Sequence, residues 1–159
     1  MNSSVLGSLL DEKKVPCNDS SLSSSEDLNF ELLSRIQKWD RNTNIESNGA
    51  AIYGVLYYNL VRNYRDQILE NNNIVTKEIL LSALSDVNFY LKENFGSIDI
   101  TLGDYQKLVR GDKEIPIWGL PDVITAMTSR LYKNGKIGVF AGESYIGLIR
   151  FTKDGPEME

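Results

Sequence analysis

The segment KEILLSALSDVNFYLKENFGSIDITL, residues 77–102, decides the fold class because the spacing of its apolar residues changes part-way along it. Its first part repeats apolar residues every three or four positions, which is the spacing of one helix face: Leu80, Leu84, Val87 and Leu91. Thr76 is a good N-cap, and Gly96 suits the left-handed position after the helix end. Beyond Gly96 polar and apolar residues alternate, so residues 97–102 are expected to form a half-buried strand.

Two further helices are predicted upstream of this segment. Residues 28–39 carry one apolar face, and Asp27 is a plausible N-cap for it. Residues 49–70 should form the second helix, whose first half is apolar nearly all round and therefore buried on more than one side. Three tyrosines share one face of that helix, which we interpret as half-buried packing: Tyr53, Tyr57 and Tyr64.

The part of the chain after Gly96 has the composition of strands and turns. Asn134-Gly135 provides the positive φ angles of a tight turn, between strands at residues 131–132 and 137–140. Residues 123–130 are ambiguous, and their β-branched side chains favour a strand. Residues 145–151 form another strong strand pattern, which we expect to pair antiparallel with residues 137–142. The predicted fold class is therefore α+β, with helices followed by antiparallel strands.

The organisation along the chain follows from composition. Residues 1–27 hold eight serines and two lysines against five acidic residues, and we expect a flexible Ser-rich acidic segment. Within it, the apolar residues 5–10 are a candidate element of a larger structure. Residues 28–159 form the α+β region, with helices over about residues 28–94 and strands over about residues 97–159. The final residues resemble the start of another strand after a turn, as though the chain had been cut there.

Composition excludes several classes of function. The formal net charge is −5, which argues against nucleic acid as a partner. The chain has no histidine and a single cysteine, Cys17, so histidine-based catalysis, His-ligated zinc and an internal disulfide are excluded. The chain has no run of eighteen apolar residues, so no membrane span is predicted. Its first eleven residues lack the pattern of a secretory signal.

Local motifs give no specific site. Four carboxylates fall in a loop-rich stretch and admit two interpretations, a calcium site or solvated loop charge, of which we favour the second: Asp104, Asp112, Glu114 and Asp122. Arg110-Gly111-Asp112 is interpreted as a turn rather than an adhesion motif. Trp39 and Trp118 are each expected to pack in the core rather than line a pocket. Cys17 has no histidine to activate it and is interpreted as inert.

Three groups of motifs resemble the penicillin-acylase-like amidases. Residues 102–112, LGDYQKLVRGD, and 115–122, IPIWGLPD, resemble the family's W-G-D-x-x-x-L-x-R-G-D … P-x-x-G-x-x-D region. The GESYI and FTKDGP sequences within residues 142–156 resemble its later G-x-S-Y-x … F-x-x-D-G-P strand pair. The WD and ESNGAAIY sequences within residues 39–53 resemble its helix entry. Leu102 stands where the family has tryptophan, and Gln106 where it often has histidine.

The resemblance implies an N-terminal-nucleophile hydrolase with an α/β/β/α core. Such enzymes cleave amide bonds of acylated substrates, including penicillins, acyl-homoserine lactones and lipopeptides, and a serine at a newly formed chain start uses its own α-amine as base. The family's nucleophilic serine, oxyanion-hole asparagine and calcium-binding acids lie upstream of the matched region. No catalytic, cofactor-binding or metal-binding residue is therefore assigned here. Gly7-Ser8 looks like a processing site, but Leu9-Leu10 after it does not match, so Ser8 is not assigned as nucleophile.

Two hypotheses about function follow. In the first, the chain is a C-terminal fragment of such an acylase, without the catalytic centre and inactive alone, and its partner is the remainder of the acylase. In the second, it is a complete non-enzymatic α+β interaction module. The fragment hypothesis predicts uncovered apolar faces and unpaired strand edges, and hence self-association. Family members are usually periplasmic or secreted, and the sequence fixes no location for this chain.

Overall fold

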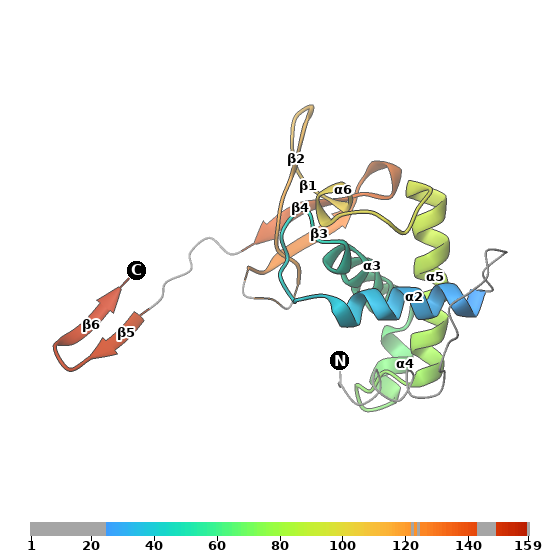
Figure 1. Ribbon diagram of the computed structural model, residues 1–159, viewed down its shortest axis with the longest axis horizontal. Coiled ribbons are helices and arrows are strands. Elements are labelled where there is room, and N and C mark those ends of the chain that lie inside the picture. The colour runs from blue at the N-terminus through green and yellow to red at the C-terminus, as the bar shows by residue number, and fades with distance from the viewer. Residues whose placement is uncertain (1–24, 122, 124, 143–148, 159) are drawn as a thin grey trace.

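The computed structural model describes residues 25–121, 123, 125–142 and 149–158 (Figure 1). The expected flexible segment 1–27 therefore lies outside the described residues except at its end, where the first described helix begins. The helices and strands follow in this order: α2 (Ser25–Lys38), α3 (Asn48–Asn63), α4 (Arg65–Glu70), α5 (Lys77–Phe95), α6 (Leu102–Tyr105), β1 (Gln106–Arg110), β2 (Lys113–Pro116), β3 (Met127–Leu131), the 3-10 turn η1 (Lys133–Gly135), β4 (Ile137–Gly142), β5 (Ile149–Thr152) and β6 (Gly155–Met158).

The helices form where apolar periodicity and caps coincide. The Thr76 side chain accepts a hydrogen bond from the Ile79 N–H, and Gly96 ends α5 in the left-handed conformation at φ 72°, as predicted. Helix α2 begins at Ser25, so Asp27 lies inside it rather than at its N-cap. The helix expected over residues 49–70 is two helices, because the chain turns at Tyr64 between α3 and α4.

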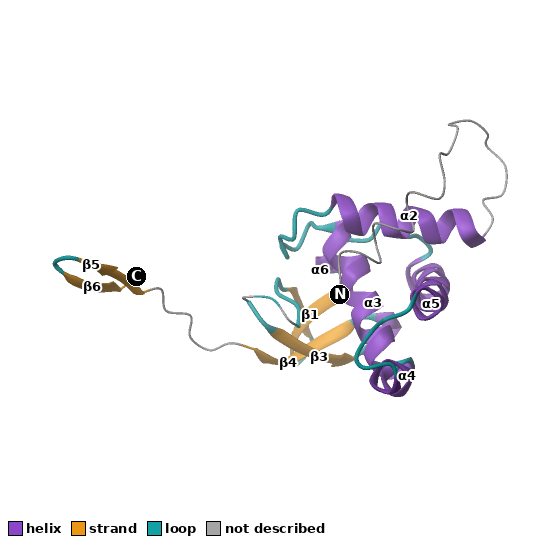
Figure 2. Ribbon diagram, turned by 90° about the horizontal axis from the view of Figure 1, so that it is seen from below, coloured by secondary structure: helices purple, strands orange, loops and turns teal. Residues whose placement is uncertain are grey.

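The core lies where α2, α3 and α5 meet, and the sheet packs on one side of this group (Figure 2). Fully buried side chains come from each of these helices and from the sheet, and include Leu32, Ile52, Leu84, Leu91 and Ile137. Helix α3 is buried on more than one side, as its sequence predicts. Among the described residues, no helix is both long enough and apolar enough to cross a lipid bilayer.

The main sheet has four strands in the order β2-β1-β4-β3. The β1–β2 and β3–β4 pairs are antiparallel, whereas β1 and β4 are parallel. The α+β class is confirmed, but the expectation of antiparallel strands alone is wrong at the β1–β4 pair. The turn between β3 and β4 has Asn134 at φ 55° and Gly135 at φ 67°, which confirms the predicted positive φ angles.

Two expected strand features are wrong. Strand β4 has β1 and β3 on its two sides, so it does not pair with β5, which pairs with β6 instead. Residues 143–148, expected to hold the turn and the start of the partner strand, lie outside the described residues. Residues 97–102 form no strand either: Ile98 and Ile100 are buried as the alternation predicts, but the chain there is irregular and leads into α6.

Candidate functional site

A buried polar network joins the inner face of the sheet to α3. Gln106 on β1 is fully buried, and its Nε2 donates to the carbonyl oxygens of Gly119 at 2.6 Å and Ile117 at 3.2 Å. Its Oε1 accepts from the Ser129 hydroxyl on β3 at 3.2 Å. The Ser129 N–H in turn donates to the Tyr58 hydroxyl on α3 at 2.9 Å. Because buried polar groups are costly without partners, this network fixes the sheet and the 117–119 loop against the helices.

A second polar cluster holds the segment that follows α5. The Asn48 side-chain amide at the start of α3 donates to the carbonyl oxygens of Ile98 at 2.9 Å and Ile100 at 2.8 Å. The Asn48 Oδ1 accepts from the Arg35 guanidinium, which also pairs with Asp99. One side chain therefore satisfies the backbone groups that a neighbouring strand would otherwise have satisfied.

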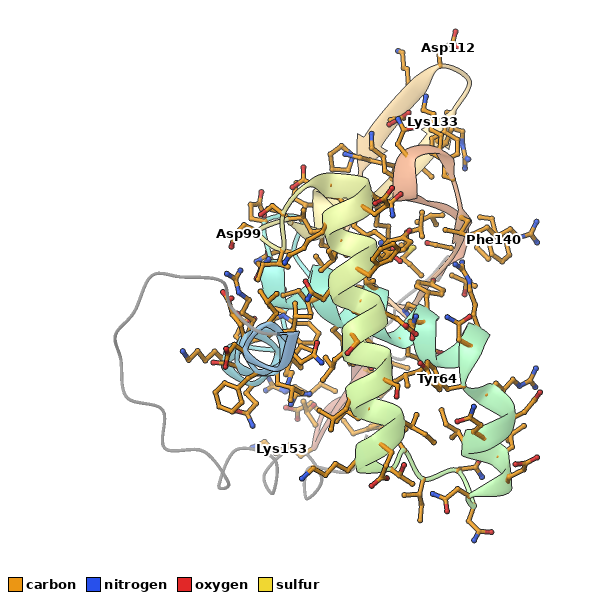
Figure 3. All side chains as sticks on the ribbon, turned by 90° about the vertical axis from the view of Figure 1, so that its right-hand side faces the viewer. Tyr64, Asp99, Asp112, Lys133, Phe140 and Lys153 are labelled. Carbon is orange, nitrogen blue, oxygen red and sulfur yellow. The ribbon has the colours of Figure 1, made fainter. Side chains whose placement is uncertain are left out.

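The outer face of the sheet carries an exposed aromatic side chain. Phe140 lies an odd number of positions after the buried Ile137 on β4, so it points to the face opposite the core. It is 52% exposed and projects away from the helices (Figure 3). The Arg130 guanidinium lies 3.9 Å from the centroid of its ring. Ile115 on β2 and Leu131 on β3, at the two edges of the sheet, are about half exposed as well.

The β5–β6 hairpin stands apart from the helices and the four-stranded sheet in both views (Figures 1 and 2). Ile149 is 54% exposed and Phe151 is 82% exposed. Large apolar side chains with this exposure often mark a surface that contacts another protein segment. A two-stranded hairpin by itself is also only marginally stable in water. The outer face of the four-stranded sheet at Phe140 and the sheet edges at Ile115 and Leu131 form the candidate functional surface of this chain, and the β5–β6 hairpin is a second, separate apolar element.

An ion-pair cluster lies beside this surface. Glu114 on β2 accepts hydrogen bonds from Lys133 at 2.7 Å and Lys136 at 2.9 Å. These two ammonium groups lower the pKa of the Glu114 carboxyl from its usual 4.5 to about 2, with Lys133 the larger cause. The cluster ties the outer β1–β2 hairpin to the turn between β3 and β4.

The carboxylates singled out in the sequence do not come together. Asp104 accepts from the backbone N–H of Thr101 in a capping box, and that bond lowers the pKa of Asp104. Glu114 is engaged by lysines, and Asp112 lies at the tip of the β1–β2 hairpin (Figure 3). Asp122 lies outside the described residues, and in the part of the chain that the structure describes no three potential ligands are grouped to hold a metal.

The two tryptophans differ from each other. Trp39 packs against the core as expected, with its ring 5.3 Å from that of Tyr53. Trp118 is 56% exposed, so the expectation that it packs in the core is wrong. It lines an open cavity with the loop before α3, and the N–H of Gly119 beside it donates a hydrogen bond to the Thr43 carbonyl oxygen. The Arg110-Gly111-Asp112 sequence forms the turn between β1 and β2, as interpreted.

Sequence reasoning did not single out Asn48 as a structural residue, and noted Gln106 only as a departure from a motif. A weak signal existed for Gln106: it is a polar residue between the apolar Tyr105 and a strand whose centre, Leu108-Val109, is apolar. The partners of both side chains are distant in sequence, so their roles depend on the tertiary structure.

Comparison with known proteins places this arrangement in a family. The family model for penicillin amidase matches residues 3–159, which is nearly the whole chain. The chain belongs to the penicillin amidase family. No curated protein matches it. The family match covers all the elements described above, so the α+β arrangement is that of a penicillin amidase family member. Family membership makes this chain part of an acylase-like amidohydrolase family.

Proposed function

We propose that the chain is a C-terminal portion of a penicillin-acylase-like N-terminal-nucleophile amidohydrolase, and that it supplies scaffold without the catalytic centre. The observation that carries the proposal is the family match over residues 3–159 combined with motifs that resemble the later part of the family's heavy chain. The residues that perform the chemistry in such enzymes belong to the preceding part. The chain by itself then hydrolyses no amide.

The outer surface of the sheet supports a scaffold role. In a layered hydrolase core a second sheet covers the face that the helices leave open, and Phe140 lies on that face here. The β5–β6 hairpin, with Phe151 exposed, fits a segment that packs against another part of the polypeptide. The remainder of the acylase is the proposed partner of both.

The helical side supports the same role. The networks around Gln106 and Asn48 are internally satisfied, so they hold the sheet in place without the rest of the enzyme. A preformed helix and sheet unit of this kind orients a surface for docking and needs no catalytic group of its own.

The test is an assay of the purified chain with a chromogenic acyl amide, with the Ser8→Ala variant beside it. We expect no turnover from either protein, because the nucleophile and the oxyanion donors supply most of the rate in amide hydrolysis. Heat-sensitive turnover by the unaltered chain would contradict the proposal. If Ser8→Ala abolished it, Ser8 would be the nucleophile; if turnover survived Ser8→Ala, the site would lie elsewhere in the chain.

A further inference from the structure

An apolar groove lies on the opposite part of the molecule from the sheet surface. It is formed by the second half of α3, by α4 and by the loop before α5, and its volume is about 280 Å³. It lies where α3 ends at Asn63 and α4 begins at Arg65, beside Asn73 and Val75 of the following loop. Its lining is mostly apolar and includes Tyr57, Val61, Ile68, Leu69 and Val75.

The groove is open to solvent at its rim. Val61 is 46% exposed and Leu69 is 53% exposed. Arg65 is a charged side chain in the same lining. An apolar channel with exposed aliphatic side chains and one cation at its wall fits an apolar segment followed by acidic residues.

The chain itself contains such a segment. Residues 5–10, Val-Leu-Gly-Ser-Leu-Leu, are followed directly by Asp11-Glu12 and then by Lys13-Lys14, so the acidic pair is the charge nearest to the apolar residues. The family match begins at residue 3, so the sequence pattern of the family runs through this segment.

The connection is long enough. Residues 11–24 separate the apolar segment from the start of α2 at Ser25. Fourteen residues reach up to roughly 50 Å when extended, at about 3.3–3.6 Å each. Helix α2, with 14 residues, is only about 21 Å long. A serine-rich tether of this length can therefore carry the segment past α2 to the groove.

We propose that residues 5–10 dock in the groove between α3, α4 and the 71–75 loop of the same chain. Their aliphatic side chains cover Val61 and Leu69, and the acidic pair at Asp11-Glu12 lies toward Arg65. Residues 11–24 act as the tether. The proposal concerns how the chain completes its own helical side, and it is independent of the acylase activity.

Disulfide trapping in the full-length chain tests the proposal. In a Cys17→Ser background, the pair Leu9→Cys and Leu69→Cys places one thiol on the segment and one in the groove. The control pair is Leu9→Cys and Phe89→Cys, because Phe89 is 71% exposed and lines a separate cavity on α5. Oxidised glutathione is the oxidant, and non-reducing gels with mass spectrometry identify the products.

The Phe89→Cys control is stringent because α2, from which the N-terminal segment extends, packs close to the cavity that Phe89 lines. The Asn29 side chain of α2 donates to Ser85 on α5 at 2.8 Å, and Ser85 lines the same cavity as Phe89. A tail that moves freely from Ser25 would meet Phe89 at least as readily as the groove. We expect an intramolecular disulfide to predominate with Leu69→Cys and to be minor with Phe89→Cys. Equal yields for the two pairs would overturn the proposal, and so would a disulfide-linked dimer, which would make a second copy the occupant.

A stability cycle gives a second, independent readout. Leu9→Asp should lower the urea midpoint of the otherwise unaltered chain, but should have little further effect when Leu69→Asp is already present. Leu22→Asp, in the tether, should leave the midpoint unchanged in both backgrounds. Full additivity of Leu9→Asp and Leu69→Asp would contradict a direct contact between the segment and the groove.

Discussion

Replacing Gln106 with leucine should destabilise the chain more than any comparable change on the sheet. Gln106 is fully buried, and it makes three hydrogen bonds: two to backbone carbonyls and one from the Ser129 hydroxyl. Leucine fills a similar space but leaves these three groups without their partner. An unsatisfied buried group costs about 1–3 kcal/mol, and leucine regains part of that by apolar burial.

The expected loss in the free energy of unfolding is about 2–4 kcal/mol, a large part of the roughly 5–15 kcal/mol by which domains are stable. The assay is urea denaturation followed by circular dichroism, with an unchanged m-value as a check on two-state unfolding. Lys107→Met is the matched control, since the next residue on β1 points to the outer face and should change stability by less than about 0.5 kcal/mol.

Ser129→Ala extends the test. It removes the hydroxyl that donates to Gln106 and leaves the Ser129 N–H bond to Tyr58 in place. The two substitutions should be non-additive, because each removes the same hydrogen bond. If the free energy of unfolding of Gln106→Leu lies within about 0.5 kcal/mol of that of the unaltered chain, the buried network does not hold the sheet.

Three further predictions concern other parts of the fold. The folded-state pKa of Glu114, about 2, lies below its usual 4.5, so its stabilising contribution is present above about pH 4.5 and is lost as the pH falls toward 2; Glu114→Gln should flatten the pH dependence of stability in that window, and an unchanged acid transition would count against the lysine cluster. Asn48→Ala should lower the free energy of unfolding by about 1–3 kcal/mol, because the carbonyl oxygens of Ile98 and Ile100 lose their donor. Residues 97–101 should then be cleaved faster by protease, and a cleavage rate equal to that of the unaltered chain would refute the prediction. Gly111→Ala should destabilise the chain by roughly 1 kcal/mol, because its φ is positive, and Gly135→Ala should destabilise it by more. Both glycines have positive φ, but only at Gly135 would a Cβ overlap Asn94. Equal decreases in the melting temperature of the two variants would show that the overlap relaxes at no cost.

The helices could be predicted because their signals are local. The apolar spacing of Leu80 and Leu84 and the caps at Thr76 and Gly96 lie within one segment, and they fix α5 without reference to anything distant. The break at Tyr64 was missed because the apolar pattern continues through it. The turn at Asn134-Gly135 was predicted for the same local reason, since few residues besides these accept positive φ.

Strand pairing could not be predicted to the same extent, because partners are chosen by tertiary structure. The alternation of residues 97–102 correctly indicates which side chains are buried, but the hydrogen-bond partner of that backbone is the Asn48 side chain, about fifty positions earlier. Strand β4 pairs in parallel with β1, a contact that no local turn specifies. The exposure of Trp118 likewise depends on the path of the loop before α3.

The functional residues could be predicted least of all. The resemblance in the sequence indicated the family, which the family match confirms. It assigned no catalytic residue, because the family's nucleophilic serine and oxyanion-hole asparagine were expected upstream of the matched motifs. The positions that matter most for the arrangement, Gln106 and Asn48, act through distant partners, so their roles became visible only when those partners were located.

The central claim, that this chain is a scaffold portion of a longer acylase, is tested most directly by sequencing the transcript that encodes it through both ends. We predict that the reading frame continues, or continued before interruption, into penicillin-amidase sequence on the side before Met1 and again after Glu159. That upstream sequence should include the serine that follows the processing site. Flanking sequence with no relation to the family on either side would contradict the account and favour a self-contained α+β module.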